Sequence, residues 1–484
     1  MQTLCSSVNP VKMQDMRKLQ KSSRRRWTEC GLLLGIFLAA NPAARAADVV
    51  SIWGGARGTL VMKSDGTVWT WGANFGGKLG IGLAPAATNH VTIPVEVHGP
   101  GNIGFFNSAK IIMGGEMHNV AVREDGTVWA WGANMNTFGL LGNGSTNDAS
   151  VPMQVSGLQN VVALGGRDYH TLAVESNGTI WAWGWNATGA LGNGTTNATL
   201  VPVQVVGLTN PAIVSGGYQF SVALMPDGTV YQWGIGRVIG SSWTPQQIPG
   251  FSNVVGISCG WDHALALKSN GTVWAWGKND MGAIGDGSTS NRPSPVQVTG
   301  LSNMVAVSGG DSHSSALDAD GTIWKWGKND VGELGNGTTN TVANPVPVRI
   351  LTDNYGAGFS DVVMMAARDY QNIAVKTDGS VWQWGANDYG QCGDNSLVDR
   401  WRPVKVYDLG PRVPLSLKLQ PSIQKGQLDL SWPSATGEFF TIQYTTNLMT
   451  GFTATLPTNI PGDFPTNIFT LPVTNDRCFY RLKF

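Results

Sequence analysis

Short runs of alternating apolar and polar residues, interrupted by Asp-Gly or Asn-Gly, recur along most of the chain. One such run is His118-Asn119-Val120-Ala121-Val122, an alternation that places successive side chains on opposite faces of a β-strand. Each dipeptide is followed by a second run with two aromatic residues two positions apart. The dipeptides are Asp65-Gly66, Asp125-Gly126, Asn177-Gly178, Asp227-Gly228, Asn270-Gly271, Asp320-Gly321 and Asp378-Gly379. Each of them predicts a hairpin with a two-residue type I′ turn.

The unit around the hairpin contains two further strands. An apolar segment that ends in small residues precedes each hairpin, and a segment with proline follows it, for example Pro202-Val203-Gln204-Val205. The unit occurs seven times at a spacing of roughly fifty residues. Four short strands per unit without helical periodicity predict an all-β fold, a seven-bladed β-propeller with four-stranded antiparallel blades. The alternative is an open solenoid, which would need polar capping repeats, and neither end of the array has one.

The third unit is the most complete copy and relates the chain to a known family. It reads Gly166…His170…Asn177-Gly178…Trp183-Gly184…Gly189-Ala190-Leu191-Gly192…Pro202-Val203. This pattern resembles the regulator of chromosome condensation repeat, and the resemblance extends over roughly residues 49–409. It implies a closed ring, and it brings guanine-nucleotide exchange and chromatin binding as activities known in the family. Three units depart from the pattern at the histidine position, where they have Gly58, Phe220 and Gln371.

Residues 1–46 differ from the array and predict a signal peptide. The basic segment from Arg17 to Arg26 precedes the apolar run from Gly31 to Ala40, and Ala44-Arg45-Ala46 follows. This is the order of a secretory signal peptide with its cleavage site. An apolar run of ten residues is too short for a bilayer of about 30 Å, which argues against a permanent anchor. No later stretch looks transmembrane, so we expect no integral membrane segment after the leader is removed. The mature protein is then secreted, periplasmic or on the cell surface.

The charge of the mature chain argues against a nucleic-acid partner. The sequence has 32 basic and 32 acidic residues, of which eight and two lie in the leader, so 24 and 30 remain and the net charge is −6. Nucleic-acid binding requires a basic surface, and chromatin binding is therefore disfavoured. Three cysteines remain outside the leader, an odd number that is not a disulfide framework.

The last part of the chain lacks the repeated unit and predicts a second domain. Alternating segments such as Gln427-Leu428-Asp429-Leu430-Ser431-Trp432 stand between turn residues. They predict a small β-sandwich, and they resemble the fibronectin-type-III-like modules of secreted bacterial proteins. An eighth blade is the alternative, but this segment lacks the hairpin and the tryptophan pair. The predicted division is a signal peptide at 1–46, the propeller at 47–410 and the sandwich at 411–484.

Residues that usually carry chemistry recur here as parts of the repeat. His118, His170, His263 and His313 share one position, so neighbouring copies lie a blade apart and predict structural histidines instead of zinc ligands. Asp280, Asp330 and Asp388 share another position and are typical of turns, although calcium also binds such oxygens. The sequence has no Gly-x-Ser-x-Gly, phosphate-binding loop or His-Glu-x-x-His. We expect no catalytic residue, no metal and no cofactor.

The loops between the glycine pair and the histidine position vary between units and combine aromatic with charged residues. This composition is typical of interaction surfaces, although any one of these residues would also fit an ordinary solvated loop. The candidate binding residues are Arg57, Glu116, Tyr169, Tyr218, Trp261, Asp262, Asp311 and Tyr370. They favour a non-catalytic interaction module that binds a protein or an envelope polymer. The alternatives are an enzyme acting on extracellular polysaccharide and a guanine-nucleotide exchange factor, which export would separate from cytosolic GTPases.

Overall fold

The computed structural model describes residues 49–407 except 56, 84–89, 136 and 236–239, together with residue 409 and the strands beyond it. The chain divides into two compact units, residues 1–408 and 409–484. The predicted signal peptide lies outside the described residues and stays a prediction. In the part of the chain that is described, no helix is long and apolar enough to cross a membrane.

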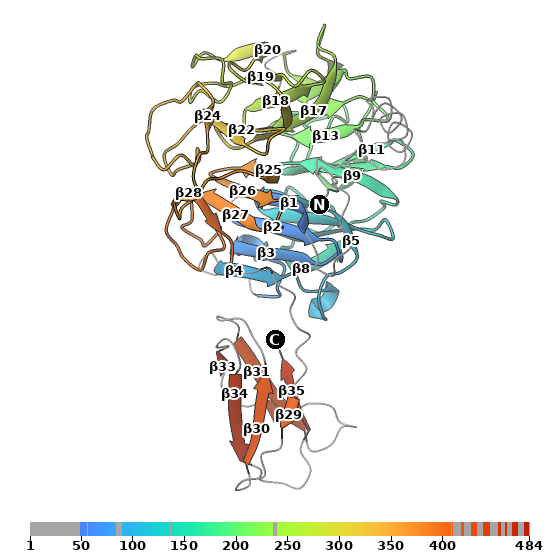
Figure 1. Cartoon of the computed structure of the whole chain (residues 1–484). Coiled ribbons are helices and arrows are strands. Elements are labelled where there is room, and N and C mark those ends of the chain that lie inside the picture. Colours follow the sequence, from blue (N-terminus) through green and yellow to red (C-terminus); the bar gives the residue numbers. More distant parts are fainter. Residues whose placement is uncertain are drawn as a thin grey trace, which may run out of the picture. The chain divides into compact units, whose positions relative to one another are not determined.

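Seven four-stranded antiparallel sheets make up the first unit, and each sheet consists of four strands that are consecutive in sequence (Figure 1). Blades 1 to 3 are β1 Val49–Gly55, β2 Gly58–Lys63, β3 Val68–Ala73, β4 His90–Glu96; β5 Ala109–Gly114, β6 His118–Arg123, β7 Val128–Gly132, β8 Ala149–Gln154; and β9 Val161–Gly166, β10 His170–Glu175, β11 Ile180–Gly184, β12 Thr199–Gln204. Blades 4 and 5 are β13 Ile213–Gly216, β14 Phe220–Leu224, β15 Val230–Gly234, β16 Ser242–Gln247; and β17 Val254–Cys259, β18 His263–Lys268, β19 Val273–Gly277, β20 Arg292–Gln297. Blades 6 and 7 are β21 Met304–Gly309, β22 His313–Asp318, β23 Ile323–Gly327, β24 Val348–Arg349; and β25 Val362–Arg368, β26 Gln371–Lys376, β27 Val381–Gly385, β28 Arg400–Lys405. The predicted seven-bladed propeller is confirmed.

The order of strands within a blade places the variable loops on one face. The first strands of neighbouring blades lie next to one another around the ring, and β25 lies next to β1. The fourth strand is therefore an outer edge, where the prolines cost no ladder hydrogen bond. Because the strands are antiparallel, the loops after the first and third strands open on the same side, which we call the loop face. The hairpins between the second and third strands lie on the opposite face.

The predicted hairpins are confirmed, but their turn type is not I′. Only the glycine of each pair has a positive φ, between 78° and 84°, whereas a type I′ turn requires a positive φ at both central residues. In blade 1 the Gly66 amide donates to the Lys63 carbonyl at 3.0 Å, and the Asp65 carboxylate accepts the Thr67 amide at 3.0 Å. This is a type I turn followed by a glycine in the left-handed region. Three loop residues instead of two decide the turn type.

The repeated tryptophan that precedes Gly joins each blade to the one before it. Its side chain is fully buried in all seven blades. In blades 3, 4 and 6 its indole donates to a backbone carbonyl in the loop of the preceding blade, Trp183 to Leu140 at 3.1 Å, Trp233 to Ala190 at 2.8 Å and Trp326 to Ala283 at 2.8 Å. The repeated tryptophan therefore packs neighbouring blades against one another. This role explains why a tryptophan recurs at this position in every unit.

The histidines join each blade to the one that follows. Nε2 of His118, His170 and His263 lies 2.8–2.9 Å from the hydroxyl of Thr171, Ser221 or Ser314 in the next blade. Burial lowers the pKa of His118 and His263 to about 3 and that of His170 to about 4, so these rings are neutral in the folded protein near neutral pH. They occupy the same structural position in blades 2, 3 and 5.

The junctions that lack histidine have other partners. Phe220 replaces histidine in blade 4, and the next blade has Ala264 where blades 1, 3, 4 and 6 have a hydroxyl, so this junction is apolar. At the closure of the ring, Trp71 donates to the Gln383 side chain at 2.8 Å, and the Gln371 amide donates to the Gly58 carbonyl at 2.9 Å. The ring closes without exchange of a strand, because each blade is one continuous segment.

The second unit is described by its strands alone. They are β29 Lys418–Gln420, β30 Gln427–Trp432, β31 Phe439–Thr445, β32 Ala454–Thr455, β33 Ile460–Pro461, β34 Asn467–Pro472 and β35 Phe479–Lys483. One sheet has the order β29-β30-β34, and in the other β31 pairs with β32, β33 and β35. All of these pairs are antiparallel. The fibronectin-type-III-like sandwich stays a prediction.

Candidate functional site

The eight candidate residues all lie in the loops between the first and second strands, and therefore on the loop face. Arg57 is exposed and Asp311 is buried. The other six are partly buried: Glu116, Tyr169, Tyr218, Trp261, Asp262 and Tyr370. The structure brings Tyr169, Tyr218 and Trp261 together, whereas Arg57 and Tyr370 belong to other blades of the same face.

Five aromatic side chains from blades 2 to 5 form a continuous row, which we call the aromatic wall. Tyr218 lies at its centre, with its ring centroid 4.9 Å from that of Trp261, 5.7 Å from Tyr169 and 6.0 Å from Trp185. Phe138 extends the row beyond Tyr169, at 6.3 Å. The Trp185 and Tyr218 rings are stacked within 15°, and the other pairs are tilted or edge-on. Contacts of this kind hold each ring in one orientation.

Backbone hydrogen bonds join the loops beneath the wall. The Tyr218 amide donates to the Trp261 carbonyl at 2.9 Å, and the Trp261 amide lies 3.2 Å from the Gly310 carbonyl and 3.3 Å from that of Asp311. The Asp311 amide in turn donates to the Asp369 carbonyl at 3.0 Å. Loops of blades 4 to 7 are thus linked, so the part of the wall formed by Tyr218 and Trp261 is ordered before any partner binds, which reduces the entropy lost on binding.

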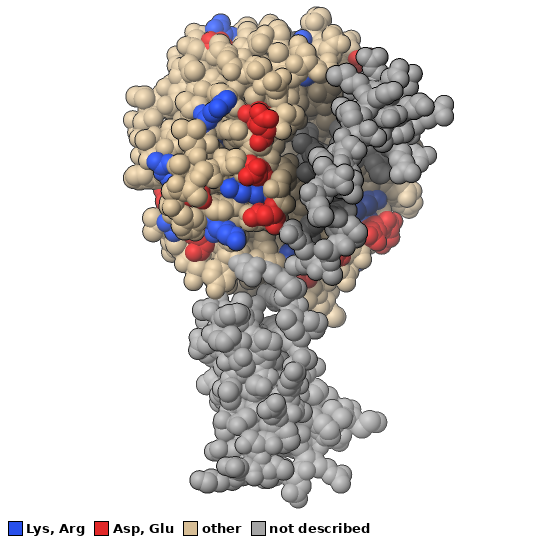
Figure 2. Space-filling view, in the orientation of Figure 1, with Lys and Arg blue, Asp and Glu red and all other residues tan. Residues whose placement is uncertain are grey.

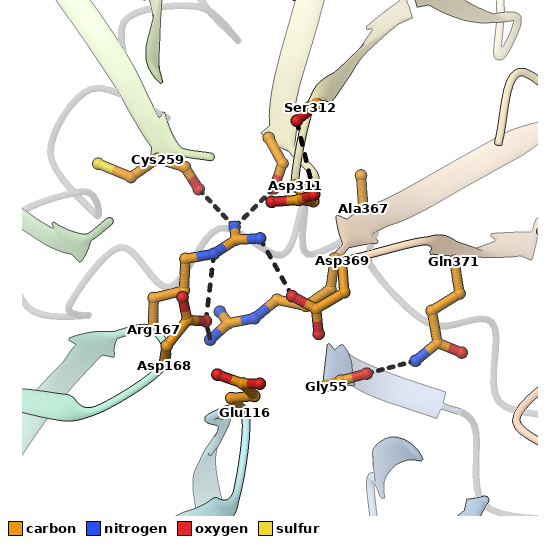
Figure 3. Close-up of polar contacts among 12 residues, drawn as sticks. Gly55, Glu116, Arg167, Asp168, Cys259, Asp311, Ser312, Ala367, Asp369 and Gln371 are labelled. Carbon is orange, nitrogen blue, oxygen red and sulfur yellow. Dashed lines mark hydrogen bonds and ion pairs between the residues drawn. The ribbon is translucent and has the colours of Figure 1, made fainter. Parts of the chain in front are cut away.

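A buried group of charges on the propeller axis supports these loops (Figure 3). Arg167 stands where most units have the second glycine, and its guanidinium donates to the carbonyls of Cys259 and Gly309 at 3.1 and 3.2 Å. It also pairs with Asp369 at 3.3 Å and with Asp168 at 3.4 Å. Arg368 occupies the same repeat position in blade 7 and lies 3.8 Å from the Asp168 carboxylate. One arginine therefore joins blades 3, 5, 6 and 7.

Desolvation dominates the titration of this buried group. It raises the pKa of Asp168 to about 7 and that of Asp311 to about 6, against the lowering effect of Arg167. It lowers the pKa of Lys78 to about 8, and the Lys78 ammonium donates to the Glu116 carbonyl at 2.7 Å. The side chains of Arg167 and Asp168 are 0 and 1% exposed, so the raised pKa of Asp168 reflects its burial, whereas the carboxylates around Arg167 raise the pKa of its guanidinium against burial.

The loop face looks different in blades 6, 7 and 1, which we call the covered half. The Arg57 guanidinium lies 4.9 Å from the Tyr389 ring centroid and 5.7 Å from that of Phe75. The Lys328 ammonium lies 4.4 Å from the Tyr370 ring centroid and 2.9 Å from the Asp330 carboxylate. The aromatic rings of this half therefore already contact cations of the chain itself. A shallow pocket of about 380 Å³ between these residues has charges of both signs.

The rest of the surface offers less to a partner. A hollow of about 660 Å³ on the hairpin face is lined by Asp125, Gly126, Thr127 and residues 154–160, none of which is aromatic or basic. Figure 2 shows that large parts of the surface in view carry neither acidic nor basic side chains.

Within the described residues, no group of three or more histidine, cysteine or acidic side chains could hold a metal ion. Asp280 pairs with Lys278 at 3.1 Å, and Asp388 accepts a hydrogen bond from Gln391.

Four residues of the site were not predicted from the sequence, although the position of each in the repeat distinguishes it. Arg167 and Arg368 replace a glycine that the other five units have at that position. Trp185 directly follows Trp183-Gly184, at a position where no other unit has an aromatic residue. Phe138 belongs to a loop after a third strand, whereas all the predicted residues belong to loops after first strands. Topology places both sets of loops on the same face.

Family models match most of the propeller. The RCC1-like domain matches residues 112–419, and the regulator of chromosome condensation (RCC1) repeat matches residues 65–122. Among curated relatives, the human E3 ubiquitin-protein ligase HERC2 is 34% identical over 134 residues, 26% of this chain and 2% of that protein. Protein pim1 of Schizosaccharomyces pombe is 30% identical over 149 residues, 28% of this chain and 27% of that protein. The matched segments thus cover 2% of the length of HERC2 and 27% of the length of pim1.

Solved structures share the fold. Prp20p of Saccharomyces cerevisiae, which was studied for its binding to Gsp1p and histones, has a TM-score of 0.60 and 22% identity over 72% of this chain and 88% of its own. Human WBSCR16 has a TM-score of 0.60 and 18% identity over 71% of this chain and 95% of its own. At identities of 22 and 18%, this similarity shows the shared propeller fold and says nothing about a ligand.

Proposed function

This chain belongs to the family of RCC1-like domains, and we propose that it is an exported, non-catalytic module that binds a protein partner on its loop face. The predicted leader supports export to the envelope or the medium. Prp20p binds Gsp1p and histones, and yeast RCC1 has been solved bound to Kap60, so protein binding is an established use of this propeller in relatives.

The single observation that carries the proposal is the aromatic wall. Its five rings are partly exposed and form a connected set of ring contacts, and backbone hydrogen bonds link the loops of four of them, Tyr169 to Trp185 and Tyr218 to Trp261. Tyrosine and tryptophan are enriched where protein interfaces gain most of their binding energy, because they offer a large contact area at low entropic cost. An ordered row of such residues on one face is what a protein partner requires.

The titratable groups support a binding role over a catalytic one. Asp168 and Asp311 have raised pKa values, but their carboxylates lie under the loops close to Arg167. A general acid or base must reach the proton that it transfers, and the Asp168 side chain is only 1% exposed. The module would therefore hold its partner by contact alone.

The test is affinity capture from the envelope and medium of the producing cells. The bait is the purified protein beside the variant Tyr169→Ala, Tyr218→Ala, Trp261→Ala, and retained material is identified by mass spectrometry and sugar analysis. The matched controls are Trp243→Ala and Trp401→Ala, since these residues are 52 and 50% exposed on the outer strands β16 and β28. We expect one protein that the native bait and both controls retain and the triple variant loses.

Other results would overturn the proposal. Equal retention by the triple variant, at unchanged thermal stability, removes the aromatic wall as the binding surface. If the bait retains a polysaccharide alone, the proposal of a protein partner is wrong. If the bait also releases reducing sugar from that polysaccharide, the protein is an enzyme. Accelerated release of a guanine nucleotide from a GTPase would likewise replace binding with exchange activity.

A further inference from the structure

The two parts of the loop face differ in whether their rings contact a cation. In the covered half, Lys328 lies over Tyr370 and Arg57 lies over Tyr389. The aromatic wall has no such cover: among the described residues, no lysine or arginine lies over the rings of Tyr169, Trp185, Tyr218 or Trp261. A ring face attracts cations through its quadrupole, so these rings can accept one from outside.

The charges around the two tyrosines differ in the same direction. Burial and the carboxylates of Asp168, Glu116 and Asp262 raise the pKa of Tyr218, and no cation among the described residues opposes them. Burial and the carboxylates of Asp311, Asp369 and Asp330 also raise the pKa of Tyr370, but Lys328 opposes them. The potential at Tyr218 is therefore more negative than at Tyr370, and a positive charge there would be stabilised.

Two of the carboxylates beside the wall are near the surface. Asp262 follows Trp261 directly and is partly exposed, and it forms no ion pair within the described part of the chain. The Glu116 carboxylate contributes to the raised pKa of Tyr169, and its Oε2 atom is buried. The Asp262 carboxylate therefore gains an ion pair when a partner brings a cationic donor.

We infer that the aromatic wall binds a lysine or arginine side chain of the protein partner, placing the cation against Tyr218 and Trp261 and beside Glu116 and Asp262. The inference rests on the proposed function and names the chemistry of the partner at that site. An ammonium or guanidinium group satisfies both features of the site, because it is attracted to ring faces and donates to carboxylates. A neutral or acidic segment would leave the Asp262 carboxylate without an ion pair.

The experiment uses fluorescein-labelled hexaarginine, hexalysine and hexacitrulline as probes of the purified protein, with dissociation constants from fluorescence anisotropy at low and high salt. Citrulline keeps the shape of arginine without its charge. We expect hexaarginine to bind about tenfold more tightly than hexacitrulline, and less tightly at high salt.

Variants locate the binding. Trp261→Ala and Asp262→Asn are each expected to weaken hexaarginine binding by about threefold to tenfold. The matched control is Asp320→Asn, which removes the same charge from an exposed turn on the hairpin face and is expected to change nothing. Thermal unfolding of each variant verifies the fold. Equal binding of hexacitrulline overturns the inference, and so does an equal effect of Asp320→Asn, since attraction would then come from the net charge alone.

This inference and the proposed function fail in different ways. If capture yields a partner that the triple variant loses but Asp262→Asn and Glu116→Gln still hold with native affinity, the module stands and the basic contact is wrong. If hexaarginine binds at the wall but capture yields no protein, the basic contact stands and the protein-binding function is wrong. Loss of the captured partner in Asp262→Asn, together with unchanged capture by Asp320→Asn, supports both.

Discussion

The open aromatic wall and the covered half of the loop face are built from the same repeat positions. Trp185 and Lys328 both directly follow a Trp-Gly pair, and each contacts a tyrosine of the next blade. Trp185 stacks on Tyr218 with the centroids 6.0 Å apart, whereas the Lys328 ammonium lies 4.4 Å from the Tyr370 ring. The repeat thus determines where a tyrosine stands, and one variable residue determines whether its ring accepts a cation from a partner.

The largest effect is expected where the two halves meet, at Arg167. Its guanidinium bonds the Cys259 carbonyl below the wall and the Asp369 carboxylate beside Tyr370. Arg167→Met removes these bonds and leaves buried carboxylates without their main partner. We expect the free energy of unfolding to fall by about 3–5 kcal/mol, measured by urea denaturation.

A partly exposed arginine provides the control for that loss. Arg292 pairs with Asp286, and its side chain is 36% exposed. Arg292→Met should change the free energy of unfolding by less than about 1 kcal/mol, because water replaces the lost contacts. If Arg167→Met is no more destabilising than Arg292→Met, the buried charges are not what holds the two halves together.

The second prediction concerns stability in acid. It compares the junction between blades 3 and 4, which contains His170, with the junction between blades 7 and 1, which contains Gln371. His170 lies 2.8 Å from Ser221 and has a folded-state pKa lowered to about 4 from the ordinary 6.5. As the pH falls from 6.5 towards 4, the unfolded chain binds a proton that the folded protein does not, so stability is lost in that window. The closing junction uses Gln371 instead, which does not titrate.

The variant that tests this is His170→Gln, which gives blade 3 the residue that blade 7 has at the same repeat position, Gln371. It removes one titrating group, and the loss of stability between neutral pH and pH about 4 should shrink by on the order of 3 kcal/mol. Urea denaturation at both pH values measures the difference. A variant that loses as much stability on acidification as the native protein would contradict the assignment of the lowered pKa to His170.

Repetition made the fold predictable, and the same repetition concealed part of the site. The Trp-x-Trp-Gly and Asp-Gly signals recur because every blade needs them for packing and turning, so seven copies predicted seven blades. The turn type was wrong because an Asp-Gly pair fits both a two-residue and a three-residue loop, and only the strand register decides between them.

Site residues could be predicted where a single loop shows them. Contacts between side chains of different loops could not be predicted. Tyr169, Tyr218 and Trp261 stood out because each occupies a variable loop at the same repeat position or next to it. That Trp185 stacks on Tyr218, and that Lys328 covers Tyr370, depends on contacts between neighbouring blades that no single unit contains. The division of the face into open and covered parts therefore became visible only in three dimensions.

A substitution at the deciding position should convert the open wall into a covered one. Trp185→Lys places an ammonium of the chain next to Tyr218, as Lys328 does for Tyr370, and removes one ring of the wall. We expect about tenfold weaker binding of hexaarginine, by fluorescence anisotropy, since the site is then occupied and less negative. Trp185→Phe keeps a ring without the charge and should lose much less, and an equal loss in both variants would mean that ring size and not cover determines binding.

The smallest effect is expected from the reverse change. Lys328→Ala uncovers Tyr370 and frees Asp330, which the ammonium contacts at 2.9 Å. The uncovered half gains one ring and one carboxylate but no neighbouring wall, so hexaarginine should bind about twofold more tightly in total. Combining it with Trp261→Ala isolates the new contact, because the wall is then weakened. If Lys328→Ala adds nothing in that background, a single uncovered tyrosine is insufficient, and the continuous row of rings is the feature that a cationic partner requires.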